Sequence, residues 1–165
     1  MRFFLLFIIA IVSLALQTTV FGKLTLAGAK PDLLLITVVF FAFIKGPKAG
    51  AGLGFVYGLL EDLVVGRFIG LNALAKAATG LVVGLTEGKI YKENLIAPGL
   101  LIIVASMING LLVTALLMIA GVPVNFTDSF WRILLPAAIY NLGIAPLLYL
   151  KFYQSISSGI LSSKK

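Results

Sequence analysis

Residues 50–88, GAGLGFVYGLLEDLVVGRFIGLNALAKAATGLVVGLTEG, are apolar enough to lie in a bilayer, yet they carry Glu61, Asp62 and Lys76. Residues four apart are neighbours on one face of a helix. At that spacing the stretch holds two rows of glycines, each interrupted by one charge. The first row is Gly50, Gly54, Gly58, Asp62, Gly66 and Gly70, and the second is Asn72, Lys76, Gly80, Gly84 and Gly88. The pattern predicts two helices that pack through their glycines.

Glycine ridges let helix backbones approach closely, which is how helices associate within lipid. A charge on such a ridge faces protein, because facing lipid costs several kcal/mol. If residues 66–70 form the turn, Asp62 and Lys76 both lie roughly 6–9 Å below it. We therefore predict an ion pair between them, with outward snorkelling of Lys76 as the alternative. Since a spacing-four row drifts about 40° per step, only two or three glycines of each row can touch one partner helix.

The composition is that of a membrane protein. The 165 residues are 61% hydrophobic and 12% charged, with a mean hydropathy of +1.13, whereas soluble domains are about 45–50% apolar and about 25% charged. We expect one all-α integral membrane domain over residues 1–165. The net charge of +7 is scattered between apolar spans, which argues against nucleic-acid binding. Because histidine and cysteine are absent, imidazole or thiolate metal sites and His-based catalysis are excluded.

Six transmembrane helices are predicted, since ~20 apolar residues cross a bilayer. Their approximate ranges are 3–21, 31–45, 49–65, 71–88, 95–121 and 130–150. The second is short, with Pro31 and Asp32 suited to its first turn, and we expect it to begin inside the bilayer. Pro136 and Pro146 should kink the sixth.

Lysine and arginine predict the orientation, because they concentrate on the cytoplasmic side. With the N-terminus inside, the inner side holds Arg2, Lys45, Lys48, Lys89, Lys92, Lys151, Lys164 and Lys165, and the outer side holds Lys23, Lys30, Arg67 and Arg132. Both termini are therefore expected in the cytoplasm. The alternative for the first span is a signal peptide cleaved near Ala27-Gly28-Ala29, but that site lies far beyond the apolar run, so we expect a retained helix.

The remaining polar residues have structural and functional interpretations. Glu61 and Asp62 point about 100° apart on a helix. They form either a proton or cation site, or one buried structural carboxylate and one that faces a polar crevice, and we favour the second. Asn72 is either an N-cap or first-turn residue or a ligand contact. Asn109 and Asn141 lie mid-span, where we expect hydrogen bonds between helices rather than a substrate site.

Aromatic residues near the predicted span ends, namely Trp131, Tyr140 and Tyr149, are expected to anchor the membrane interface. No phosphate loop, H-E-x-x-H or G-x-S-x-G motif is present. We therefore expect no catalytic residue, metal site or cofactor. A membrane-embedded enzyme using Glu61 or Asp62 ranks last among the possible functions, because no second catalytic group is evident.

Four segments of the chain together resemble a known family. They are residues 31–32 (PD), 45–50 (KGPKAG), 54–62 (GFVYGLLED) and 70–74 (GLNAL). This combination is similar to the bacterial rod shape-determining protein MreD family, and length and hydropathy match over nearly the whole chain.

The resemblance carries over to individual residues. Asp32, Asp62, Gly70 and Asn72 fall on the family's PD, GLLxD and GLNAL positions, whereas Lys76 departs from the apolar residue usual there. The resemblance implies that the predicted Asp62–Lys76 pair is a local feature of this chain.

The resemblance also implies a fold and a function. The fold would be similar to the S components of energy-coupling-factor transporters. The function would be that of a non-enzymatic inner-membrane scaffold of cell elongation, acting with MreC, RodA and a class B penicillin-binding protein under filaments of MreB. The alternative is a small-molecule-binding transport subunit with a pocket bordered by Asp32, Asp62, Asn72 and the 66–70 turn.

Overall fold

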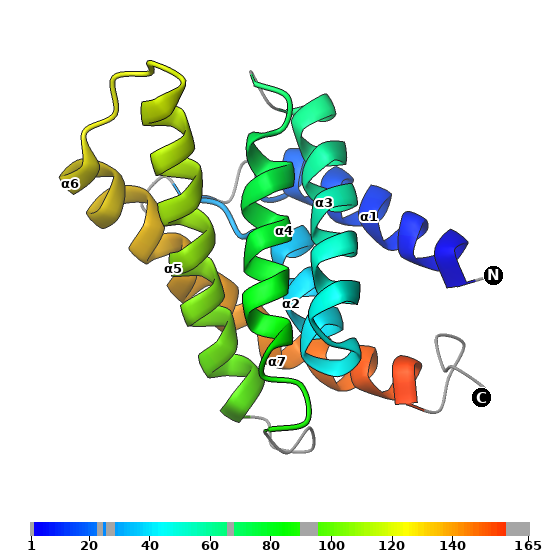
Figure 1. Cartoon of the computed structure of the whole chain (residues 1–165). Coiled ribbons are helices and arrows are strands. Elements are labelled where there is room, and N and C mark those ends of the chain that lie inside the picture. The colour runs from blue at the N-terminus through cyan, green and yellow to red at the C-terminus, as the bar shows by residue number, and fades with distance from the viewer. Residues whose placement is uncertain (1, 23–24, 26–28, 66–67, 90–95, 158–165) are drawn as a thin grey trace.

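The computed structural model describes residues 2–22, 25, 29–65, 68–89 and 96–157, and the regular elements within these ranges are all helices. Their order is α1 (Arg2–Thr19), α2 (Leu33–Lys45), α3 (Pro47–Val64), α4 (Leu71–Gly84), α5 (Ile96–Ile119), α6 (Phe126–Ser129), η1 (Phe130–Leu134) and α7 (Leu135–Ser157) (Figure 1). The last three follow one another without a break, so these ranges form six helical rods. The prediction of an all-helical chain with six helices is confirmed.

The largest boundary differences lie in the fourth and sixth helices. Helix α4 ends at Gly84, and residues 85–89 form turns where the sequence becomes polar. The sixth rod begins at Phe126 rather than at residue 130, because the Asn125 side chain accepts a hydrogen bond from the Thr127 N–H (3.2 Å) and caps it. Kinks were expected at Pro136 and Pro146; the π-helical η1 ends at Leu134, just before Pro136, and Pro146 lies inside α7. A proline N has no hydrogen to donate to the preceding turn, and a wider turn accommodates that loss.

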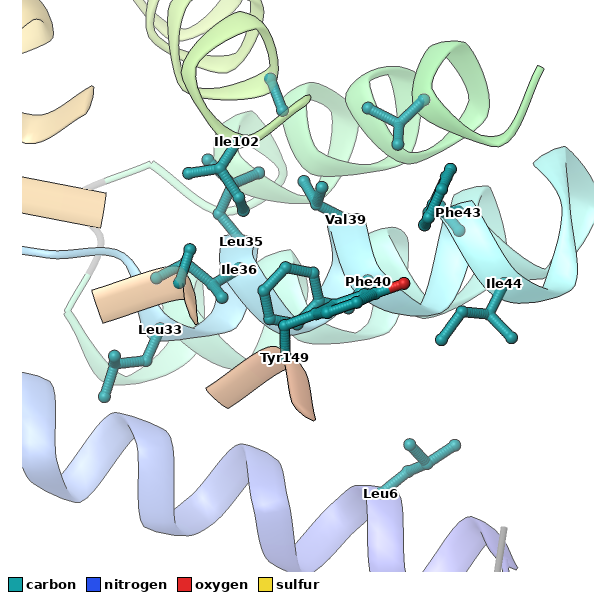
Figure 2. Close-up of a cluster of buried hydrophobic side chains, with 14 residues drawn as sticks. Leu6, Leu33, Leu35, Ile36, Val39, Phe40, Phe43, Ile44, Ile102 and Tyr149 are labelled. Atoms are coloured by element: carbon teal, nitrogen blue, oxygen red, sulfur yellow. The ribbon is translucent and has the colours of Figure 1, made fainter. Parts of the chain in front are cut away.

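Helix α2 lies at the centre of the bundle and contacts α1, α3, α4, α5 and α7. All of its residues except Phe41 and Lys45 are buried. With 13 residues it is about 20 Å long, which is shorter than the ~30 Å hydrocarbon layer. Figure 2 shows the apolar side chains packed around it. The rings of Phe40 and Tyr149 meet edge to face, with their centroids 5.0 Å apart. Tyr149 is only 1% exposed, so its predicted role as an interface anchor is wrong: it belongs to the core.

Helices α3 and α4 run antiparallel and make the most extensive contact in the described chain (Figure 1). A Cβ atom added at any of five glycines would overlap the facing backbone. The facing pairs are Gly50 with Gly80, Gly54 with Lys76, Gly58 with Asn72, and Gly84 with Pro47. Three glycines of the first row and two of the second therefore touch the partner helix, as the drift of the rows predicts.

Gly70 was expected to pack helices, and that expectation is wrong. It is the N-cap of α4, with φ +106°, and a Cβ there would meet nothing within 4 Å. Glycine is favoured there because other residues rarely adopt a positive φ. Gly66 lies outside the described residues, as do Ala27 and Gly28 of the alternative cleavage site.

Helix α1 is an integral part of the core. Leu6, Ala10 and Leu14 are buried, and the Tyr57 hydroxyl donates a hydrogen bond to the Leu6 carbonyl oxygen (2.6 Å). Gln17, near the end of the helix, reaches the start of α2. Removing α1 would expose these apolar surfaces on α2 and α3.

The outer surface is apolar on most of the helices. Large exposed side chains include Phe4 and Ile11 on α1, Val56 and Leu63 on α3, Leu74 and Leu81 on α4, and Leu100 and Val104 on α5. Apolar patches of this extent mark protein or membrane contact. Among the described residues, Ala97–Ile119 is the one helix long and apolar enough to cross a bilayer by length and composition, and Phe4–Thr19, Leu33–Lys45 and Leu71–Gly84 are apolar but shorter.

The glycine packing predicts a contrast between two substitutions on α3. Gly54→Leu should lower the free energy of unfolding by about 3 kcal/mol or more, because the side chain would separate two backbones. Gly52→Leu, half a turn away, should leave stability nearly unchanged, because a Cβ there meets nothing within 4 Å. Unfolding of the purified variants in mixed micelles measures both. Equal stability of the two variants would contradict the close-packing role.

Candidate functional site

The start of α2 lies inside the bundle, where other helices satisfy its polar groups. Asp32 caps the helix, since its Oδ1 accepts a hydrogen bond from the Leu35 N–H (2.8 Å). From α1, Gln17 donates its Nε2 hydrogens to the Pro31 carbonyl (3.3 Å) and to Asp32 Oδ1 (3.4 Å). Pro31 and Asp32 thus lie at the start of the helix, as expected, and Gln17 of α1 donates hydrogen bonds to both.

Asn141 on α7 connects this point to α5. Its Oδ1 accepts from the Asp32 backbone N–H (2.7 Å), and its Nδ2 donates to Ser106 Oγ (2.9 Å). Asn141 is 2% exposed. It makes the hydrogen bonds between helices that were expected of it. Asn109 is also buried, at 8% exposed, but its Oδ1 accepts no hydrogen bond from any described residue.

Lys76 lies at the centre of this region with no exposed surface. Its ammonium forms ion pairs with Asp32 and with Glu61 Oε2, the latter at 2.8 Å. The predicted pair with Asp62 is wrong, and so is the alternative in which Lys76 snorkels outward. The backbone of Lys76 packs against Gly54 of α3, and its side chain reaches Glu61 of α3 and Asp32 at the start of α2.

Asp62 instead caps helix α4 from the neighbouring helix. Its carboxylate accepts hydrogen bonds from the backbone N–H groups of Gly70 (2.8 Å), Asn72 (3.2 Å) and Ala73 (3.2 Å), and from Asn72 Nδ2 (2.8 Å). The first N–H groups of a helix have no partner within that helix, and the N-cap Gly70 has no side chain to supply one. A carboxylate at the positive end of the helix meets that need.

Glu61 and Asp62 therefore contact different partners, as expected for adjacent residues that point about 100° apart on a helix. Asp62 is 2% exposed and structural, whereas Glu61 borders a cavity of about 500 Å³. The polar residues that line this cavity are Gln17, Thr18, Lys30, Asp32, Glu61, Asn72, Ser106, Asn109, Thr114, Ser129 and Asn141. Of the residues expected around a pocket, Asp32 and Asn72 line it and Asp62 does not.

The sequence analysis missed Gln17 and Ser106, which lie in apolar helices and were given no role. Their signal is position, because each is a polar residue at a position of a largely apolar helix that is not exposed. Among the described residues, no three His, Cys, Asp or Glu side chains are grouped so that they could hold a metal ion. The charged groups fasten α2, α3 and α4 to one another.

The ion pairs predict which charges are energetically coupled. Breaking a buried pair by removing one partner typically costs ~3–5 kcal/mol. In a double-mutant cycle of stability, Lys76→Met should couple to Asp32→Asn by about 1–3 kcal/mol, because the second change removes the charge left unpaired by the first.

In the matched cycle of Lys76→Met with Asp62→Asn, the two losses in the free energy of unfolding should be nearly additive. The reason is that Asp62 accepts hydrogen bonds from α4 and does not contact Lys76. The free energy of unfolding of each variant in mixed micelles supplies both cycles. Stronger coupling to Asp62 than to Asp32 would refute the assignment.

Comparison with models of protein families gives a match over most of the chain. The family model described as rod shape-determining protein MreD matches residues 1–156 of the 165-residue chain. No individual curated protein and no solved structure matches the chain. The match includes Asp32, Asp62, Gly70 and Asn72, which hold the starts of α2 and α4 in place. Because the match covers almost the whole chain, this protein belongs to the rod shape-determining protein MreD family.

Proposed function

We propose that this chain is a non-enzymatic scaffold of the cell-elongation machinery: a single domain of six transmembrane helices in the bacterial inner membrane, with both termini in the cytoplasm. The family supplies the role in rod shape determination. In this role the chain binds MreC and helps to organise RodA and a class B penicillin-binding protein with MreB. The fold likeness to the S components of energy-coupling-factor transporters remains part of the proposal.

The observation that carries the proposal is the opposite placement of polar and apolar groups. Charged and amide side chains lie inside and join α1, α2, α3, α4, α5 and α7, whereas large apolar side chains cover the outside. Buried polar contacts in lipid fix one arrangement of helices. A fixed shape with an apolar exterior suits the docking of other transmembrane helices.

One apolar groove is suited to the single transmembrane helix of MreC. It lies between α1 and α3, has a volume of about 440 Å³ and is lined by Leu6, Phe7, Phe41, Lys48, Ala49, Gly52, Leu53, Val56, Tyr57 and Leu60. Two of the lining residues, Ala49 and Gly52, are small, and small residues let a second helix approach closely. Lys48 lies at the cytoplasmic end of α3 in the proposed orientation.

Photocrosslinking in cells that also express MreC tests the proposed docking site. A photoreactive residue at Phe7 or Val56, in the groove, should capture MreC, whereas one at Leu74 or Leu81, on the exposed face of α4, should not. Gly52→Leu should reduce capture and disturb rod shape while the protein accumulates normally, because it fills the groove without touching the fold. Equal capture at both sets of positions would exclude this groove, and no capture at any outward position would remove the scaffold proposal.

The cavity beside Glu61 supports a second candidate, a small-molecule-binding transport subunit. Its volume of about 500 Å³ lies within the ~300–1,000 Å³ usual for ligand pockets. Thermal unfolding of the purified chain with a panel of vitamins separates the candidates. For a scaffold we expect no change in Tm. A vitamin that raises Tm by several degrees, and is retained at micromolar concentration, would favour the transport subunit.

A further inference from the structure

The corner where the chain passes from α5 into the sixth rod carries a cluster of aromatic side chains. The rings of Phe126 and Phe130 are stacked with their centroids 6.5 Å apart, and those of Phe130 and Trp131 meet edge to face at 5.4 Å. Trp131 is 63% exposed, so the described helices leave most of its surface uncovered. Figure 1 shows α6 at the edge of the bundle, where it contacts little beyond η1. An exposed apolar cluster of this kind marks a surface that meets lipid or a partner.

The same segment carries an exposed ion pair, which narrows the choice of surroundings. Arg132 Nε lies 3.7 Å from Asp128 Oδ1, one helical turn away, and both side chains are mostly exposed. Exposed charges are costly within hydrocarbon, whereas exposed aromatic rings are disfavoured in water. The boundary between lipid and water suits both kinds of group, and aromatic and cationic side chains are enriched there.

The length of α5 places this corner at such a boundary. The apolar part of the helix, Ala97–Ile119, is 23 residues long. At 1.5 Å per residue it spans about 35 Å, slightly more than the ~30 Å of hydrocarbon in a bilayer. A helix of this length that crosses the bilayer has its end, Ile119, at one edge of the hydrocarbon. Six residues, 120–125, connect that end to α6.

We propose that residues 126–133 bind the headgroup region of the bilayer as an interfacial anchor. The rings of Phe126, Phe130 and Trp131 lie at the top of the acyl chains, and Asp128 and Arg132 lie among the headgroups. Phospholipid phosphates accept hydrogen bonds from the guanidinium and from the Trp131 indole N–H. The anchor sets the depth at which the sixth rod enters the bilayer. We rely here on the membrane placement in the proposed function, and not on the binding of MreC.

Fluorescence quenching by lipid tests the proposal, because Trp131 is the only tryptophan of the chain. The full chain is placed in vesicles of phosphatidylglycerol and phosphatidylcholine, the latter brominated at a series of heights along its acyl chains. We expect Trp131 about 15 Å from the bilayer centre, at the edge of the ~30 Å hydrocarbon layer. In the matched control, Val104→Trp with Trp131→Phe, the reporter lies on the exposed side of α5, about four residues from its midpoint. It should therefore lie about 6 Å from the centre.

Removing the ion pair tests whether the charges set this depth. Asp128→Leu with Arg132→Leu should move Trp131 toward the centre by about 5 Å, because the segment is then apolar on all sides. Both side chains are exposed, so the helical circular dichroism should not change. An unchanged depth of Trp131 in this variant would refute the role of the charges.

Two results with the wild-type chain would overturn the anchor. One is a Trp131 that lies no shallower than the α5 reporter. The other is a Trp131 that acrylamide quenches and no brominated lipid does, which would leave the aromatic cluster facing water as a surface for another protein. Failure of the scaffold function is distinguishable from both, because it would abolish capture of MreC without changing the depth of Trp131.

Discussion

Burial of the Lys76 ammonium is the constraint on which the rest of the structure depends. An ammonium removed from water requires opposite charges and hydrogen-bond acceptors close by. The chain supplies Asp32 from the start of α2 and Glu61 from α3, so three helices must meet at one point. This explains why α2 begins inside the bundle rather than at its edge. It also explains why the buried Lys76 and Asn141 both bind Asp32, at the start of α2.

The glycine contact between α3 and α4 makes that meeting possible. Because the backbones of Gly54 and Lys76 touch, α3 and α4 lie close enough for the lysine ammonium to reach Glu61 of α3 as well as Asp32 at the start of α2. The same close approach brings Asp62 within hydrogen-bond distance of the first N–H groups of α4. The polar contacts between α3 and α4 therefore depend on the close packing of their small residues. The pair of helices would lose the caps and the ion pairs together if the backbones separated.

Much of the fold could be predicted from the sequence, because it follows from local patterns. The six helices follow from apolar runs, and the α3–α4 contact follows from glycines at spacing four. The partner of Lys76 could not be found by considering those two helices alone. Depth along α3 and α4 placed Asp62 level with Lys76, but it ignored the unsatisfied N–H groups of α4, which need the Asp62 carboxylate more. The expectations that α2 begins inside the bilayer and that Lys76 lies within it together allow Asp32 as a partner, and the structure has that ion pair.

The motif residues of the family have a common physical purpose in this chain. Asp32 caps α2 and Asp62 caps α4, and each carboxylate accepts hydrogen bonds from first-turn N–H groups that have no partner within their own helix. These capped helices keep charged groups on the inside, while large apolar side chains cover much of the outside. Under the proposed scaffold function, such a body would keep its shape while a partner helix docks, because the large side chains on its outer surface are mostly apolar. Under the same proposal, partner recognition falls to the apolar outer surface, including the groove between α1 and α3, and the buried ion pairs keep that surface in one shape.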